Sequence, residues 1–451
     1  MFRWQMAERV QVIGGGLAGC EAAWQLARRG VSVQLFEMRP ERRSPAHATD
    51  DLAELVCSNS LRSDAPENAI GLLHEELRRA GSLVLSAADA NRVPAGSALA
   101  VDRLAFAREI GARIEAEPRI ELVRREVRDL PEGLAIVATG PLTSDALAER
   151  VRKLCGDSLY FYDSIAPVVY ADSLAHERLF RASRWQSAAE GDGDYLNSPL
   201  SRDAYHAFVA ELVAADKVPL HAFEKPVYFE GCLPIEVMAE RGAETLAFGP
   251  MKPVGLEDPR GGAAPYAVVQ LRQEDKAGSL YNLVGFQTKL RIGEQRRIFR
   301  TLPGLEEAVF ARFGSVHRNT FIRAPELLDE RLQHHARPGL HFAGQMAGVE
   351  GYVESAALGL LAGVFVAAKA ASDSAPLPPP TTALGALLAH LRSADPRHFQ
   401  PMNVNFGLFP PLDARHARGP RRDRHARLAA RALEDLTPWL LAVGAPAAER
   451  V

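Results

Sequence analysis

The segment that most constrains this chain is a glycine-rich turn near its N-terminus. An apolar run at residues 10–13 leads directly into Gly14, Gly16 and Gly19, which have the spacing G-x-G-x-x-G and open a helical pattern. In a strand–turn–helix unit the first glycine permits the tight turn, the second lets the backbone approach a pyrophosphate, and the third lets the helix lie against the sheet. The pyrophosphate then sits at the helix N-terminus, where free N–H groups and the helix dipole favour negative charge. We expect a bound dinucleotide here, held by Gly14, Gly15, Gly16, Leu17, Ala18 and Gly19.

The residues that follow strengthen this interpretation. The glycine spacing alone is a weak signal, because it also occurs in turns that bind nothing. Here a second apolar run at residues 31–36 ends in Glu37, a carboxylate placed to accept a hydrogen bond from the ribose of an adenosine. Strand, glycine turn, helix, strand and acid occur in the order of a Rossmann-like α/β unit.

A second strand-and-glycine unit occurs late in the chain. Residues 340–344 form a strand pattern that enters a glycine turn, and residues 351–371 form a helix rich in small residues. Between the early and the late strand-and-glycine units, residues 170–319 mix aromatic residues, prolines and short alternating runs, which indicates an inserted α+β domain. Residues 39–63 predict a long loop with a short helical piece. The expected organisation is a first part of the dinucleotide-binding domain at 1–170, an inserted substrate domain at 171–320, and the second part of the first domain at 321–451, ending in a basic tail.

Composition limits the other possibilities. A chain of 451 residues with 47% hydrophobic residues can form two or three domains. The four cysteines are too scattered for a disulfide framework or a zinc-type C-x-x-C, so we expect a reducing cytoplasm and no metal site. No run of about eighteen apolar residues is evident, so we expect no membrane span.

Basic residues are concentrated locally, although the net charge is -3. Residues 413–431 contain seven arginines and two aspartates. Such a run is often only a solvated surface, but its contrast with the rest of the chain favours contacts with phosphate. The candidate RNA-binding clusters are Arg39, Arg42 and Arg43; Arg296, Arg297 and Arg300; and the arginines of residues 413–431.

Several longer strings carry a family resemblance. They lie at residues 36–40, 44–47, 52–63, 229–236, 342–345, 348–356 and 403–408. Together with the glycine turn, they closely resemble the bacterial folate- and FAD-dependent tRNA (uracil-5-)-methyltransferase family (TrmFO). The resemblance extends from about residue 10 to the arginine-rich tail, and this joint pattern is far more specific than any single motif.

The resemblance implies a particular activity. The dinucleotide would be FAD, and the fold a Rossmann-like FAD-binding domain with an inserted α+β domain. The enzyme would methylate C5 of uridine 54 in the T loop of tRNA, taking carbon from methylenetetrahydrofolate and reducing equivalents from NAD(P)H through FAD. The implied partners are tRNA, folate and NAD(P)H, with no membrane and no stable protein partner.

This chemistry requires a nucleophile and a base. C5 of uracil attacks an electrophile only after a thiolate has added to C6, and the C5 proton must later be removed. A lone cysteine is more often a small buried apolar side chain, but the resemblance points to Cys57 and Cys232. We assign Cys232 as the nucleophile and Cys57 as the proton acceptor or helper, with the reverse assignment left open. Cys20 and Cys155 lie in no matching motif, and we expect them to be structural.

The late glycine turn offers further cofactor contacts. Gly344, Gly348 and Gly351 should place a helix N-terminus near the flavin, where its dipole stabilises negative charge. The alternative is a turn that only closes the fold. Tyr352 could stack beside the flavin or folate ring, and packing in the core is an equal alternative.

Two other functions remain open on the sequence. A FAD-dependent oxidoreductase of small molecules would explain the glycine turn but not the strings around Cys57 and Cys232. A non-catalytic flavoprotein that binds tRNA would explain the basic clusters. A methylation assay with a parallel measurement of tRNA binding distinguishes the three.

Overall fold

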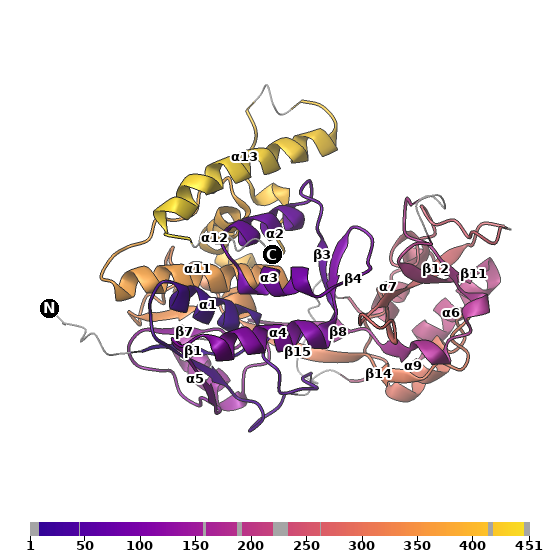
Figure 1. Ribbon diagram of the computed structural model, residues 1–451. Helices are drawn as coiled ribbons and strands as arrows, with labels where there is room; N and C mark the ends of the chain where they lie inside the picture. The colour runs from indigo at the N-terminus through magenta and orange to yellow at the C-terminus, as the bar shows by residue number, and fades with distance from the viewer. Residues whose placement is uncertain are drawn as a thin grey trace.

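A five-stranded parallel sheet forms the centre of the larger part of the molecule (Figure 1). The computed structural model describes residues 9–44, 46–156, 159–186, 192–219, 233–261, 263–413 and 418–445. The strand order is β16 (Leu340–Phe342), β7 (Ala135–Val137), β1 (Val10–Ile13), β2 (Val33–Glu37) and β6 (Ile120–Arg124). The late strand β16 pairs in parallel with β7, so this sheet joins segments from distant parts of the sequence. The predicted Rossmann-like α/β fold is confirmed.

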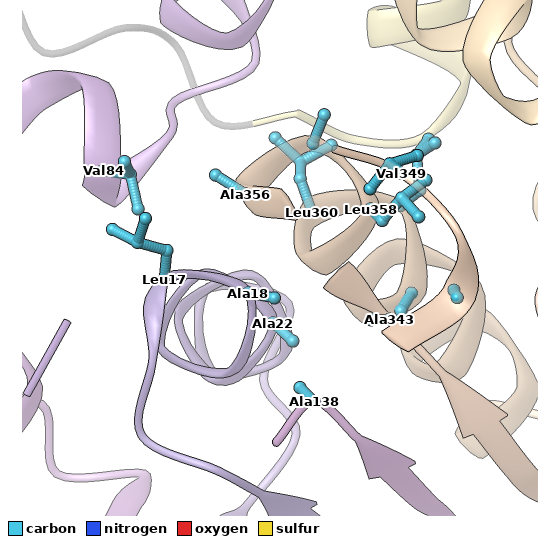
Figure 2. Close-up of a cluster of buried hydrophobic side chains, with 14 of the residues drawn as sticks. Leu17, Ala18, Ala22, Val84, Ala138, Ala343, Val349, Ala356, Leu358 and Leu360 are labelled. Atoms are coloured by element: carbon cyan, nitrogen blue, oxygen red, sulfur yellow. The ribbon is translucent and has the colours of Figure 1, made fainter. Parts of the chain in front are cut away.

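Two helices pack closely against each other beside this sheet. They are α1 (Leu17–Arg28) and α11 (Tyr352–Ala370). Figure 2 shows Ala18 and Ala22 on the side of α1 that faces α11. A Cβ atom added to Gly359 would lie 2.8 Å from Cα of Ala18, so the two backbones are in near contact. Small residues on both helices therefore allow this packing.

Helix α11 corrects one expectation from the sequence. We expected no apolar run long enough to cross a membrane, but α11 has that length and composition. However, 78% of its most apolar eighteen-residue window is buried inside the protein. Its apolar character is therefore that of a central core helix.

Further helices and a small sheet surround this core. Near the C-terminus, α13 (Arg421–Ala442) lies beside α2 (Ala69–Arg79) and crosses the top of the molecule in Figure 1. The small sheet has the order β3 (Ser60–Ser63), β5 (Ala98–Val101) and β4 (Arg92–Val93). The helices are α2 (Ala69–Arg79), α3 (Leu83–Ala90), α4 (Arg103–Ala116), α5 (Asp145–Cys155), α10 (Ala324–Leu327), α12 (Ala383–Ser393) and α13 (Arg421–Ala442).

A second, antiparallel sheet forms the smaller part, on the right of Figure 1. Its order is β10 (Phe180–Arg181), β11 (Tyr195–Leu200), β12 (Ala267–Gln273), β13 (Leu280–Leu283), β9 (Val168–Tyr170) and β14 (Phe310–Arg312). It packs with its own helices around a separate apolar core. Those helices are α6 (Arg202–Ala214), α7 (Ile235–Glu240), α8 (Thr245–Phe248) and α9 (Ile292–Phe299).

A two-stranded antiparallel ribbon runs between the two parts. Strand β8 (Leu159–Ile165) leads toward the second sheet, and β15 (Ser315–Phe321) returns from it. The chain therefore passes between the two parts twice, and the two crossing strands lie side by side. The boundaries at residues 170 and 320 stay a prediction.

The loop between β2 and β3 differs from its prediction in one respect. Its described residues contain no helix, although a short one was expected. The side chain of Glu54 accepts hydrogen bonds from the N–H groups of Ala48 and Thr49 and from the Thr49 hydroxyl. These bonds hold the loop in an irregular conformation, because they take up backbone donors that a helical turn would use.

Candidate functional site

The glycine turn forms an open cradle at the N-terminus of α1. Gly14 has a φ of 107°, and a Cβ there would lie 2.6 Å from the carbonyl oxygen of Ala138. A Cβ on Gly19 would collide with the carbonyl of Gly14, so this glycine allows α1 to pack against the turn. A Cβ on Gly16 would meet nothing within 4 Å. The cradle is therefore closed on the protein side and open on the side where a pyrophosphate would approach.

Glu37 lies directly beside this cradle at the end of β2. It is 5% exposed and accepts a hydrogen bond of 3.0 Å from the N–H of Gly15. Its other oxygen accepts bonds of 2.9 and 2.8 Å from the backbone N–H and the guanidinium of Arg39. Burial raises the pKa of Glu37, but hydrogen bonding and the charge of Arg39 outweigh it and leave the pKa below its usual value. Glu37 is thus held as a carboxylate.

The buried position of Arg39 corrects a prediction. We expected Arg39 to contact RNA, but it is 1% exposed and bridges Glu37 and Glu54. Its neighbours Arg42 and Arg43 also pair with carboxylates, the latter with Asp50 at 2.7 Å. The charges of these three arginines are compensated within the protein, and their ion pairs hold the loop in place.

Two adjoining hollows lie along the cradle. The first, of about 590 Å³, includes Gly14, Gly15, Gly16 and Glu37 in its wall. The second, of about 940 Å³, includes Cys57, Gly351 and Tyr352. Leu142 lines both hollows, so they are neighbours.

Tyr352 and Cys57 meet at the second hollow. The hydroxyl of Tyr352 accepts a hydrogen bond of 2.7 Å from the backbone N–H of Cys57. Burial, followed by the nearby thiol, raises the pKa of the Tyr352 hydroxyl. This hydroxyl therefore stays protonated and retains a proton to donate. The thiol of Cys57 is half-buried, with its Sγ 3.7 Å from the carbonyl oxygen of Ser164.

Four other predicted contacts have packing roles in this structure. A Cβ on Gly344 would lie 2.8 Å from Cβ of Ala18, and one on Gly348 would collide with the ring of Phe399. Figure 2 shows Leu17 pointing toward Val84. Gly344, Gly348, Leu17 and Ala18 are absent from the walls of both hollows. Their direct contact with a cofactor stays a prediction.

Three arginines, which the sequence did not single out, hold the segment of residues 55–59 around Cys57. Arg103 and Arg312 donate to the carbonyl oxygen of Cys57, at 3.2 and 2.8 Å. Arg272 donates to the Ser58 hydroxyl at 2.6 Å and to the Asn59 side chain at 2.9 Å. The three come from α4, β12 and β14, so only the folded chain brings them together. We call Arg103, Arg272 and Arg312 the arginine cage.

Burial affects the charges of this cage. It lowers the pKa of Arg272 and Arg312 from the usual value. It also opposes the charge on Arg103, but Glu274 at 2.8 Å outweighs burial and raises that pKa. All three guanidinium groups stay charged at neutral pH. Their hydrogen bonds to the carbonyl of Cys57 and to the side chains of Ser58 and Asn59 fix the position of this segment.

Cys232 lies outside the described residues, and its role stays a prediction. The described chain resumes at Leu233, which is 3% exposed. The N–H of Ile235 then donates to the carbonyl of Gln287 at 2.7 Å. In the described residues, no group of three or more His, Cys, Asp or Glu side chains is arranged to hold a metal ion.

Comparisons with known proteins identify the family. Residues 9–374 match the model of the family described as Glucose inhibited division protein A. A protein of Geobacter sulfurreducens is 61% identical over 440 residues, which cover 97% of this chain and 100% of that one. A protein of Myxococcus xanthus is 57% identical over 446 residues, covering 98% and 96%. Both bear the name methylenetetrahydrofolate--tRNA-(uracil-5-)-methyltransferase TrmFO.

The chain belongs to the TrmFO family. The resemblance found in the sequence is thereby confirmed over nearly the whole chain. The fold agrees with it: a crystal structure of Aquifex aeolicus GidA, 16% identical, has a TM-score of 0.69 and covers 97% of this chain and 75% of that one.

Proposed function

We propose that this chain is a FAD-dependent enzyme that methylates C5 of a uridine in tRNA with carbon from methylenetetrahydrofolate. Relatives of this name align with almost the full chain at 57–61% identity. The observation that carries the proposal is the position of Cys57. This half-buried residue lines a hollow that adjoins the dinucleotide cradle, and three arginines bind its carbonyl oxygen and the side chain next to it.

The residues present fit FAD. Gly16 leaves open space at the N-terminus of α1 for the pyrophosphate, and the carboxylate of Glu37 is positioned for the ribose. The second hollow then accommodates the ring system next to Tyr352. Bound FAD in its reduced form supplies a hydride that converts the new C5 methylene into a methyl group.

The two cysteines provide the covalent chemistry. In our assignment the thiolate of Cys232 adds to C6 of uracil, which places negative charge on the ring and makes C5 a nucleophile. C5 then forms a bond to the methylene carbon of the folate. As that bond forms, one of the two bonds from the methylene carbon to folate nitrogen breaks. Cys57 accepts the C5 proton, and the electron pair left on C5 breaks the second bond to folate nitrogen and gives an exocyclic methylene. When the hydride that bound FAD would supply adds to this methylene, the bond between sulfur and C6 breaks and the thiolate leaves.

Several finer points belong to the same proposal. The target is uridine 54 of the T loop, NAD(P)H supplies the reducing equivalents, and the enzyme works in the cytoplasm without a stable protein partner.

The test is a methylation assay with purified protein. We expect a flavin absorption spectrum, and transfer of label from methylenetetrahydrofolate to an unmodified tRNA transcript when NADPH is present. Cys57→Ala should abolish transfer and retain the flavin, whereas Cys155→Ala at the end of α5 should behave as wild type. Full activity of Cys57→Ala would remove this residue from the mechanism.

The same assay decides between the alternatives. A transcript that carries cytidine at position 54 should receive no label. Oxidation of NADPH with no transfer to any tRNA would favour an oxidoreductase of small molecules. Binding of tRNA without transfer would favour a non-catalytic protein.

A further inference from the structure

A groove lies between α13 and the segment of residues 405–412, outside the site described above. Its volume is about 850 Å³. The rings of Phe406 and His425 are 4.5 Å apart between centroids and form part of its wall. Its wall includes Asn405, Phe406, Phe409, Arg421, Arg424 and His425. The groove thus combines aromatic surface with basic side chains.

Two arginines in this wall have uncompensated charge. Arg421 and Arg424 are exposed and lie three residues apart on α13, and neither pairs with a carboxylate among the described residues. The other arginines of α13 differ. Arg422 pairs with Glu67 at 3.0 Å, while Arg427 and Arg431 donate to backbone carbonyls at 2.7 and 2.6 Å. Among the described residues of α13, the exposed arginines with neither a carboxylate nor a backbone carbonyl as partner are therefore the two at the groove.

The groove is also next to the second hollow. Asn403 lines the hollow and Asn405 lines the groove. Between them, the N–H of Val404 donates to Glu354 at 2.9 Å, and the side chain of Asn403 donates to the carbonyl of Glu350 at 2.6 Å. Two residues of extended chain span only about 7 Å. A polymer bound in the groove would thus lie close to Cys57's hollow.

We propose that this groove binds one unpaired nucleotide of the RNA substrate, with its phosphate on Arg421 and Arg424 and its base against Phe406. Single-stranded RNA is bound by such pairs of cationic and aromatic groups, because every base has a face that stacks and every linkage carries a charge. The identity of this RNA as tRNA rests on the proposed function. The groove would hold a nucleotide near the target uridine while that base enters the hollow.

The first test measures the salt dependence of tRNA binding to the flavin-loaded protein. Each phosphate contact contributes about 0.7 to the slope of log Kd against log salt. R421Q/R424Q should therefore reduce this slope by about 1.4 and weaken binding at low salt by about tenfold. The matched control is R150Q/R152Q, which removes two exposed arginines from α5 and should change neither value. An unchanged slope in R421Q/R424Q would overturn the proposal.

The second test separates stacking from charge. Phe406→Leu keeps an apolar side chain but removes the aromatic face, so tRNA affinity should fall about fivefold or more with an unchanged salt slope. Reduction of the bound flavin by NADPH, which needs no RNA, should be normal in every variant and shows that each is folded. Equal affinity of Phe406→Leu and wild type would exclude base stacking here.

The outcomes also distinguish this inference from the proposed function. If wild type binds tRNA but transfers no methyl group, the proposed function fails, and the slope of R421Q/R424Q still decides the groove. If wild type methylates tRNA and R421Q/R424Q binds it with the same slope, the groove proposal fails alone.

Discussion

At the residue scale, the charge of Glu37 is balanced inside the protein. Arg39 donates to it and also pairs with Glu54 at 3.1 Å, so two carboxylates share one buried guanidinium. Because the pKa of Glu37 is lowered in the folded state, its ion pair stabilises the protein above the ordinary pKa of a glutamate. That stability is lost as the pH falls through the lowered value. At neutral pH the carboxylate is therefore charged and ready to accept hydrogen bonds from a ribose.

Glu37→Gln should weaken FAD binding. The amide keeps the shape but loses the charge that strengthens a hydrogen bond, which is worth about 1.5–3 kcal/mol, or roughly 10- to 150-fold in Kd. Titration of the apoprotein with FAD, followed by flavin fluorescence, measures the effect. Glu121→Gln on the neighbouring strand β6 is the control, because that carboxylate is exposed and lies outside both hollows. Equal Kd values for Glu37→Gln and wild type would contradict this role.

At the element scale, the contact between α1 and α11 positions the cradle. Gly359 lies against the backbone of Ala18. A Cβ atom added to Gly363 would lie 2.8 Å from Cβ of Gln25. Any added methyl group forces the helices apart, and α1 carries the glycine turn at its N-terminus. The geometry of the dinucleotide site thus depends on small residues distant from it.

Gly359→Ala should destabilise the protein and weaken FAD binding together. Overpacking of a tight interface costs about 1–3 kcal/mol, and displacement of α1 distorts the cradle. Gly111→Ala on α4 is a matched control, because a Cβ there meets nothing within 4 Å. That change should stabilise the protein by up to about 1 kcal/mol through helix propensity. Thermal denaturation and FAD titration of both variants test this, and a neutral Gly359→Ala would show that the helices can separate freely.

Glu76 links α2 to the N-terminus of α12 and gives a pH dependence. It is fully buried and accepts bonds of 2.7 and 2.9 Å from the N–H groups of Ala383 and Leu384. Burial raises its pKa from 4.5 to about 8. The folded state therefore holds a proton that the unfolded state releases, so stability is full below pH 4.5 and declines as the pH rises toward 8.

We expect Glu76→Gln to remove this decline. The difference in unfolding free energy between pH 5 and pH 8 should be smaller in the variant, by roughly 1.4 kcal/mol for each unit of pKa shift that wild type realises. Urea denaturation at the two pH values gives the result. Glu75→Gln, which changes a partly exposed carboxylate on the same helix, should retain the wild-type dependence. Parallel pH profiles in all three proteins would argue against a protonated Glu76.

At the scale of the whole molecule, polar contacts join the two parts around residues 55–59. Arg103 at the start of α4 pairs with Glu274, which follows β12 and is 3% exposed. Asn59 donates to the carbonyls of Val101 and Gln273, at 3.0 and 2.9 Å. The arginine cage is therefore also an interface between the dinucleotide-binding part and the second sheet.

Arg103→Met should be strongly destabilising. It leaves Glu274 buried without its partner, which typically costs about 3–5 kcal/mol. Arg103→Met/Glu274→Gln should regain part of this loss, since no uncompensated charge remains. Denaturation midpoints of the three proteins provide the comparison. If the double variant is no more stable than Arg103→Met, the ion pair is not the source of the effect.

The sequence by itself determined the dinucleotide cradle, the order of the main elements and the late return of the chain to the first sheet. Gly14, Gly16, Gly19 and Glu37 lie within one strand–turn–helix–strand unit, so their positions follow from local geometry. The strings around Cys57 and Tyr352 could be recognised for the same reason, because each is continuous in the chain.

Only the tertiary structure decided which charges are available. Arg39 looked like a surface cation but is buried between two carboxylates, whereas Arg103, Arg272 and Arg312 are far apart in sequence and converge on one short segment. On the sequence alone, Arg421 and Arg424, which have no carboxylate partner among the described residues, could not be distinguished from Arg422, which pairs with Glu67. The environment of a charge depends on contacts between distant segments, and no local pattern of residues records those contacts.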